Sequence, residues 1–288
     1  MKGARATNNV LLAQLMASKG VAARALLRSV NNLGVSGGAL LGAVALVVNT
    51  RRALAAILLA DALSFLLALF LFSRLRPTPA AARKQGDKSW AALRDRPFLA
   101  LTVVNGLMSL QYYVLTLALP LWVVQESSAP DWTFPALLAL NTLVVAGGQI
   151  RVSRGIHDVP SAVRHLRVAG LVFLGSMALF AVTGWLSGGQ AVALLVVAVV
   201  LHSVAEIWHA SGSFEVSVGL APAASVGTYQ AVYNLGLSGA EAVAPAVVIG
   251  CCIGAGTWGW VALGVLFALA GAVTPSVARR AGGNLATT

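Results

Sequence analysis

The sequence predicts an all-α protein that crosses a membrane about eight times. Three observations lead to this fold class: an apolar composition, apolar runs long enough to span a bilayer, and an uneven distribution of basic residues. Hydrophobic residues make up 58% of the chain and charged residues 10%, whereas ordinary soluble domains have roughly 45–50% and about 25%. A water-soluble fold cannot bury this much apolar surface, so we expect a polytopic membrane protein.

Eight stretches have the length of a membrane-spanning helix. The hydrocarbon core of a bilayer is about 30 Å thick and a helix rises about 1.5 Å per residue, so about 20 apolar residues are needed. The stretches lie at residues 29–49, 53–73, 99–124, 132–150, 168–187, 190–210, 229–253 and 257–277. The fourth is short, and the sixth carries two histidines and a glutamate, so these two meet the criterion least well.

The basic residues fall almost entirely on one side of the predicted membrane. With the N-terminus in the cytoplasm, 18 of the 20 Lys and Arg residues are cytoplasmic, and only Arg51 and Arg52 lie outside. The cytoplasmic residues are Lys2, Arg5, Lys19, Arg24, Arg28, Arg74, Arg76, Arg83, Lys84, Lys88, Arg94, Arg96, Arg151, Arg154, Arg164, Arg167, Arg279 and Arg280. This division follows the positive-inside rule and predicts a multi-pass protein of the cell membrane with both termini in the cytoplasm. Despite the net charge of +11, no nucleic-acid partner is expected, because the basic residues are not interleaved with aromatic ones on one surface.

A basic linker divides the chain into two unequal parts. Residues 74–98 contain seven basic residues and join a remnant with two spans, residues 1–73, to a six-helix bundle, residues 99–288. The segment Asn32–Gly38 recurs at Asn234–Ala240 with five of seven positions identical. Because the copies share orientation and lie six spans apart, they indicate a parallel repeat of six helices, the plan of large two-bundle transporters.

By this repeat, the first six-helix unit would begin before residue 1. Residue 99 opens the second unit, and its counterpart would lie 202 residues earlier, so we expect the first unit to lack four spans. The alternatives are a transporter that is incomplete as given, a non-transporting membrane remnant, and a subunit that needs a separate N-terminal half as its partner. The reading frame upstream of the start codon would distinguish them.

Several segments resemble the major facilitator superfamily, and in particular its twelve-helix drug and small-molecule exporters. Glycine-rich Ala22–Gly42 is similar to the family's fifth helix, although Ala39 replaces a proline of the antiporter branch, and Asp61–Phe65 is similar to its sixth. Leu220–Pro222, followed by Gly227–Gln230, is similar to the entry of its eleventh helix. The resemblance implies that the chain holds the equivalents of helices five to twelve. It further implies a secondary transporter that exports a small molecule by alternating access, driven by an ion gradient.

The third predicted span carries a polar stripe. Its members recur at steps of three and four residues: Thr102, Asn105, Ser109, Tyr112 and Thr116. This spacing places them on one helix face, which should point toward protein or water and not toward lipid. By the resemblance this is the family's seventh helix, so the stripe is expected to line the substrate cavity; the alternative is polar packing between helices.

The sixth predicted span carries His202, Glu206, His209 and Ser213, again at helical spacing. An ionisable residue within a membrane is costly, and it indicates function when its partner can be named. We expect His202 and His209 to be the partners of Glu206 and the three residues to belong to the substrate cavity. Glu206 is the candidate for proton coupling; the alternative is a structural carboxylate near the cytoplasmic end.

Two further carboxylates lie inside apolar spans. Asp61 is expected to meet one of the two arginines that precede its span. Glu241 shares a helix face with Asn234 and Ser238, which favours a hydrogen-bonded cluster between helices.

The sequence contains no pattern typical of an enzyme or of ATP-driven transport. It lacks a phosphate-binding glycine loop, a His-Glu-x-x-His helix and a cysteine–histidine metal spacing. Cys251 and Cys252 are adjacent in an apolar run and are expected to be packing residues, while Pro120 and Pro245 are expected to kink their helices. We therefore expect no enzymatic activity, cofactor or metal, and the partners to be the lipid bilayer and a small molecule of unknown identity.

Overall fold

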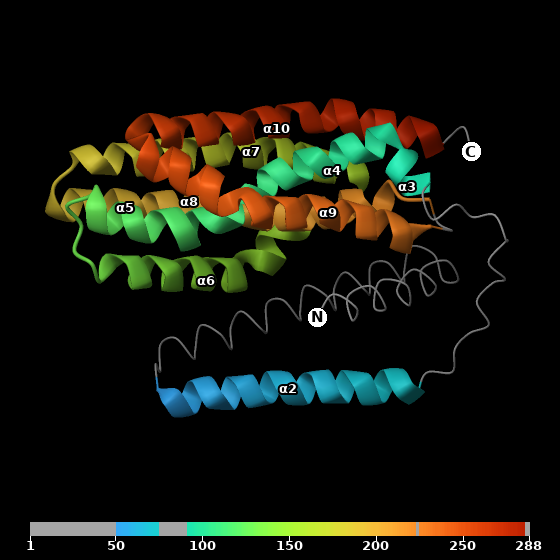
Figure 1. Ribbon diagram of the computed structural model, residues 1–288, viewed down its shortest axis with the longest axis horizontal. Helices are drawn as coiled ribbons and strands as arrows, with labels where there is room; N and C mark the ends of the chain where they lie inside the picture. The colour runs from blue at the N-terminus through green and yellow to red at the C-terminus, as the bar shows by residue number, and fades with distance from the viewer. Residues whose placement is uncertain (1–49, 75–90, 223–224, 286–288) are drawn as a thin grey trace.

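The computed structural model describes residues 50–74, 91–222 and 225–285, and in these ranges it is helical and contains no strand. Figure 1 shows α2 (Arg51–Arg74) standing apart from one bundle that contains the later helices. These are α3 (Ala91–Arg94), α4 (Arg96–Ser109), α5 (Leu119–Gln125), α6 (Thr133–Val152), α7 (Val159–Val182), α8 (Gly188–Gly219), α9 (Val226–Ala244) and α10 (Gly256–Leu285). The predicted all-α polytopic fold is confirmed.

Most of the predicted spans are present as helices. Within the described ranges, five stretches are long and apolar enough to cross a membrane: Arg96–Gln125, Val159–Trp185, Gly188–Gly219, Val226–Gly254 and Gly256–Gly283. Shorter apolar segments lie in α2, at Ala55–Leu71, and in α6, at Thr133–Gln149. The predicted span at 29–49, and with it the first copy of the repeat, lies outside the described residues.

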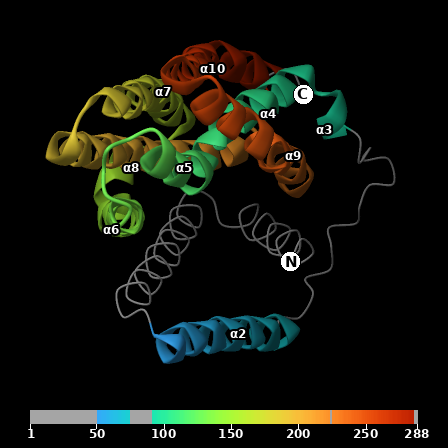
Figure 2. The same ribbon diagram turned by 60° about the vertical axis from the view of Figure 1, so that its left-hand side comes forward.

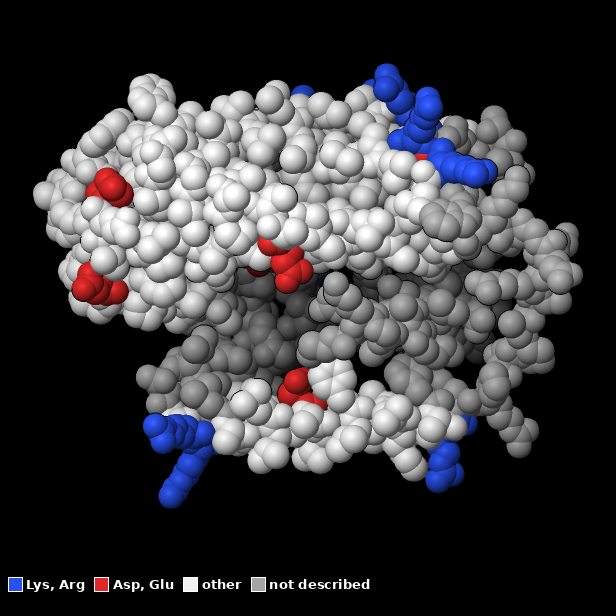
Figure 3. Space-filling model, viewed as in Figure 1, with Lys and Arg blue, Asp and Glu red and all other residues white. Residues whose placement is uncertain are grey.

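The helices alternate in direction, so that arginines gather at one end of the bundle. The N-termini of α4, α7 and α9 and the C-termini of α6, α8 and α10 meet at the right-hand end in Figure 1. We call this the basic end; its arginines are Arg94, Arg96, Arg151, Arg154, Arg164, Arg167, Arg279 and Arg280. In Figure 3, acidic side chains are visible at the opposite end of the bundle, and others lie along its middle and on α2.

The helices extend beyond the predicted spans at the basic end. α7 begins at Val159 and not at residue 168, because the side chains of Asp158 and Ser161 form a capping box at its start. α8 continues to Gly219, and α10 continues to Leu285 with Pro275 inside it. Hydropathy marks the lipid-embedded part of a helix, whereas hydrogen bonds carry the helix on into the interface.

Within the bundle, α7 packs between α8 and α10, α4 packs on α9 and α10, and α6 lies at the periphery against α8 (Figure 2). α4 and α9 approach closely where Gly106 faces Gly236: a Cβ atom added to Gly106 would lie 2.9 Å from the Gly236 carbonyl oxygen. Gly236 belongs to the second copy of the repeated segment. The glycine of this segment thus permits a tight helix crossing, as small residues do in membrane bundles.

Candidate functional site

The helix predicted for residues 99–124 is broken in its middle. α4 tightens into a 3-10 turn at Leu110–Tyr113, widens into a π segment at Val114–Ala118, and only then continues as α5. Pro120 accounts for the widening, because proline has no N–H to donate to the carbonyl one turn before it and its ring displaces that carbonyl. The predicted span is thus interrupted in its middle, at the proline that was expected to kink it.

The break divides the polar stripe. Asn105 and Ser109 are buried, Tyr112 is half-buried and Thr116 is exposed, because the π segment changes the register of the residues that follow it. A second π segment, Pro245–Gly254, continues α9. The two prolines that were predicted to kink their helices both lie at such segments.

Three hydroxyls of the stripe are satisfied within their own helix. Thr102, Ser109 and Thr116 each donate to the backbone oxygen four residues earlier, at 3.0, 2.7 and 3.4 Å. Thr102 and Ser109 are also buried, so both behave as small residues at a packed helix surface.

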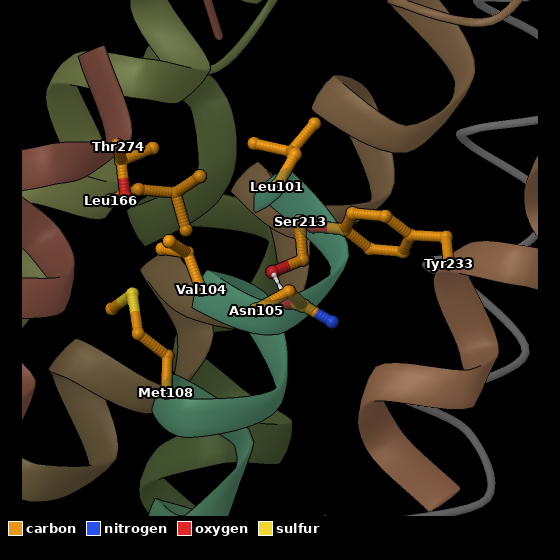
Figure 4. Close-up of a pocket in the computed structure, with 8 residues that line it drawn as sticks. All are labelled: Leu101, Val104, Asn105, Met108, Leu166, Ser213, Tyr233 and Thr274. Carbon is orange, nitrogen blue, oxygen red and sulfur yellow. Dashed lines mark hydrogen bonds between the residues drawn. The ribbon is translucent and has the colours of Figure 1, made fainter. Parts of the chain in front are cut away.

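Asn105 joins the stripe to α8. Its Oδ1 accepts a hydrogen bond of 2.7 Å from Ser213 Oγ and lies 3.3 Å from His209 Nε2. The rings of Tyr112 and His209 are 5.6 Å apart between centroids. The structure therefore brings the two predicted polar motifs together on facing helices; Figure 4 shows the Asn105–Ser213 bond.

Glu206 has a different partner from the one predicted. Asn141 Nδ2 of α6 lies 3.0 Å from Glu206 Oε2 and 2.9 Å from Ser203 Oγ, whereas neither histidine forms a hydrogen bond with the carboxylate. The rings of His202 and His209 lie instead against Phe173 of α7, at centroid distances of 5.1 and 6.5 Å. An amide in the middle of the apolar run 132–150 was the signal for Asn141, but nothing in the sequence linked it to α8.

Several buried polar atoms in this region have no hydrogen-bond partner among the described residues. They are both ring nitrogens of His202, Nδ1 of His209, and both amide atoms of Gln111. His202 and Gln111 are fully buried. Since at least about 90% of buried polar groups in proteins are hydrogen-bonded, these atoms can bind internal water. Gln111 was missed because it lies off the polar stripe, in the 3-10 turn.

The other two membrane carboxylates are not arranged as predicted. Asp61 lies ten residues beyond Arg51 in one helix, a rise of about 15 Å, so the predicted ion pair is wrong. Glu241, Asn234 and Ser238 are all exposed on α9 and form no hydrogen bonds with one another, so the predicted cluster is also wrong. Among the described residues, no three His, Cys, Asp or Glu side chains group as metal ligands.

A small cavity lies between α4, α7, α8, α9 and α10 (Figure 4). It is lined by Leu101, Val104, Asn105, Met108, Leu166, Ser213, Tyr233 and Thr274. Its volume of about 10 Å³ has room for about one water molecule, whereas pockets for drug-sized ligands measure about 300–1,000 Å³. A drug-sized substrate therefore does not fit this cavity, and of the predicted cavity residues Tyr112, Thr116 and Glu206 are at least partly accessible.

One comparison with known proteins identifies the family. The family model described as Major Facilitator Superfamily matches residues 4–245, a range that includes the polar stripe, Asn141 and Glu206. Comparisons with curated proteins and with solved structures give no match.

Proposed function

The chain belongs to the Major Facilitator Superfamily and is a membrane transporter of that type, and we propose that it exports organic cations in exchange for protons, with Glu206 as the proton-coupling residue. The observation that carries the proposal is the setting of Glu206. It is a half-buried carboxylate within a span, and its direct partner is a neutral amide, 3.0 Å away.

The surroundings of Glu206 favour a group that gains and loses a proton. An amide donor can hydrogen-bond the carboxylate without neutralising it, whereas an arginine partner would hold it permanently charged. No described residue inside the predicted spans is Lys or Arg, while Asp61, Glu206 and Glu241 are acidic. This sign of charge favours cations over anions as substrates, because an unpaired charge at membrane depth needs an opposite one.

Alternating access supplies the rest of the mechanism. In two-bundle transporters, the bundles rock about a site near the membrane midplane. We propose that a proton and a cation compete for Glu206, so that protonation from outside releases the cation and deprotonation toward the cytoplasm allows the next one to bind. Of the candidate cavity residues, Tyr112 and Thr116 would be accessible to the cation, whereas Asn105, Ser109, His202 and His209 are buried and would support the site from inside the bundle.

Substitution of Glu206 tests the proposal. The protein is reconstituted in vesicles with an imposed pH gradient, and transport of ethidium, a fluorescent organic cation, is recorded. We expect Glu206→Gln to abolish pH-driven transport while expression stays normal, because glutamine keeps the shape and hydrogen-bonding capacity but cannot titrate. The matched control is Glu241→Gln, an exposed carboxylate that should tolerate the change. Retained pH-driven flux in Glu206→Gln would exclude the coupling role, and no ethidium flux in the unmodified protein would exclude export of this cation class.

A further inference from the structure

Three arginines border one seam of the bundle, the outer side of the contact between α7 and α10. They are Arg164 and Arg167 of α7 and Arg279 of α10, and all three are exposed. Arg167 immediately precedes the apolar run that begins at residue 168, and Arg279 closely follows the one that ends at residue 277. Because charged residues flank the hydrocarbon core of a bilayer, these arginines lie at the level of the lipid headgroups.

The two helices are held close together beside these arginines. A Cβ atom added to Gly170 of α7 would lie 2.5 Å from the Phe267 carbonyl oxygen and 3.1 Å from the Cα of Gly271 in α10. Small residues permit such a close crossing. The carbonyl oxygen of Arg167 would lie 3.2 Å from a Cβ atom on Gly271, so the backbone of Arg167 borders the crossing directly.

The seam opens on the outer side of the bundle. α8 packs against the other side of α7 and α4 against the other side of α10, and Figure 2 shows both beneath the pair. On α10, Val265, Ala272 and Arg279 recur at steps of seven residues and are all exposed; because seven residues are nearly two turns, they share one face. Arg164 and Leu171 repeat this step on α7 and are also exposed. Both exposed faces therefore border the contact from outside.

Along the helix axes, the three arginines lie within reach of one headgroup. From Gly271, which is level with Arg167, α10 rises about 12 Å to Arg279, and α7 runs the other way and rises about 4.5 Å from Arg167 to Arg164. The levels of Arg164 and Arg279 thus differ by about 7.5 Å. Arginine can lay its apolar stem along a helix while its guanidinium stays in the polar layer, so the three groups can converge.

The three guanidinium groups form no ion pair within the described part of the chain. The ion pair at this end joins His157 to Asp158 at 3.8 Å, and Asp158 also caps α7 by accepting from the Ser161 N–H at 2.8 Å. Arg164 acts on Asp158 through space without pairing with it. A guanidinium can donate two parallel hydrogen bonds to a phosphate, so the seam is complementary to a phosphate anion.

We propose that this seam binds an anionic phospholipid, with its phosphate between Arg164, Arg167 and Arg279 and its acyl chains along the apolar surface below them. That surface includes Leu171 and Val265, which are 54% and 41% exposed. A free anion would contact the arginines alone, whereas a lipid would also cover this apolar surface. Basic pockets between membrane helices bind such headgroups. The site is separate from the proposed transport and does not depend on the proton-coupling residue.

Native mass spectrometry in detergent tests the site, with phosphatidylglycerol as the probe. We expect Arg167→Gln combined with Arg279→Gln to lower the affinity for this lipid about thirtyfold, since each basic residue near an anionic surface contributes about fivefold. The matched control is Arg151→Gln combined with Arg154→Gln, which removes two exposed arginines of the same basic end from the end of α6 and the turn after it. The control should lose less than about threefold, because charges outside the seam act only through screened attraction.

Thermal unfolding gives a second readout. A ligand that binds only the folded protein raises its melting temperature, so phosphatidylglycerol should stabilise the unmodified protein and the control but not the seam variant. Phosphatidylcholine should stabilise none of them. Because the substituted side chains are exposed, all three proteins should melt at the same temperature without added lipid.

Three outcomes would overturn the site. Equal losses of affinity in the two double variants would show a general attraction to the basic end. Equal binding of phosphatidylcholine would remove the role of the anionic headgroup. Equal stabilisation by inorganic phosphate at the same concentration would assign the seam to a free anion and not to a lipid. Neither readout involves transport, so each result is independent of the proposed function.

Discussion

At the scale of single residues, the transmembrane polar groups divide into those satisfied by their own helix and those that need another helix. Thr102 and Ser109 belong to the first kind, because each hydroxyl reaches a carbonyl one turn away. Glu206 and Asn105 belong to the second, with partners on α6 and α8. Only the second kind fixes how helices pack, and only these residues can change partners when the bundle moves.

The pair Asn141 and Glu206 gives a residue-scale prediction about stability. Among the described residues, Asn141 is the amide that donates to the carboxylate, and Asn141→Leu removes it. Interhelical hydrogen bonds of this kind contribute on average about 0.6 kcal/mol, with a maximum of about 1.7 kcal/mol, so the free energy of unfolding should fall within that range. In the double-mutant cycle measured by unfolding in detergent, Asn141→Leu with Glu206→Leu should cost less than the two single changes added together. Strict additivity would mean that the two side chains do not interact, and the exposed Asn234→Leu is the control.

The sequence could reveal which residues are polar inside the membrane, but not how they pair. Periodicity placed Asn105 and Glu206 on helix faces, and both lie on contact faces in the structure. Periodicity predicted His202 and His209 as the partners of Glu206, which is wrong, because residues one turn away on the same helix compete with residues on other helices. The partner Asn141 is 65 positions away in the chain, and no local pattern encodes that distance.

At the scale of elements, the approximate positions of the described apolar helices followed from apolar length, while helix ends and breaks did not. The start of α7 depends on one capping box, and the break after α4 depends on Pro120, which local hydropathy does not register. Such features depend on individual backbone hydrogen bonds, so they require the three-dimensional contacts.

The cap of α7 predicts an effect of pH on stability. The hydrogen bond from the side chain of Ser161, followed by that from its backbone N–H, lowers the pKa of Asp158 below the ordinary value of 3.8. Because the pKa is lower in the folded protein, the stabilisation is complete above pH 3.8 and is lost as the pH falls through the folded value. Asp158→Asn should therefore abolish this part of the acid destabilisation while retaining a cap, as measured by melting temperature against pH. An unchanged acid branch in the variant would assign the effect to other carboxylates.

The crossing of α4 and α9 predicts opposite effects for two glycine substitutions. Gly106→Ala places a Cβ atom 2.9 Å from the Gly236 carbonyl oxygen, and overpacking of this kind costs about 1–3 kcal/mol. Gly175→Ala, in α7, meets no atom within 4 Å and should gain up to about 1 kcal/mol of helix propensity. Thermal unfolding in detergent should lower the melting temperature of the first and maintain or raise that of the second. A neutral Gly106→Ala would show that the two helices separate at no cost.

At the scale of the whole molecule, the alternation of span directions explains why the arginines gather at one end of the bundle. Successive spans run in opposite directions, with α4 and α5 forming one span, so the connections after α3, α6 and α8 and the C-terminal end of α10 share one end. The arginines of the basic end occupy these connections and their flanking turns, while the opposite end has Glu126 and Asp131. Such a separation of charge along the bundle axis is what the membrane potential and anionic lipids select.

This separation predicts that the basic end faces the cytoplasm, and labelling of single cysteines measures it. In a protein without Cys251 and Cys252, cysteines replace Asp131 at the end opposite the arginines and His157 in the connection between α6 and α7; both positions are exposed. A membrane-impermeant thiol reagent added to intact cells should label position 131 and leave position 157 unlabelled until the cells are opened. The opposite orientation is unfavourable because Arg151, Arg154, Arg164 and Arg167 would have to cross the membrane against its potential. Moving each positive charge costs about 2.3 kcal/mol for a potential of 100 mV. Labelling of position 157 in intact cells would show that the protein has the opposite orientation, with the basic end outside the cell.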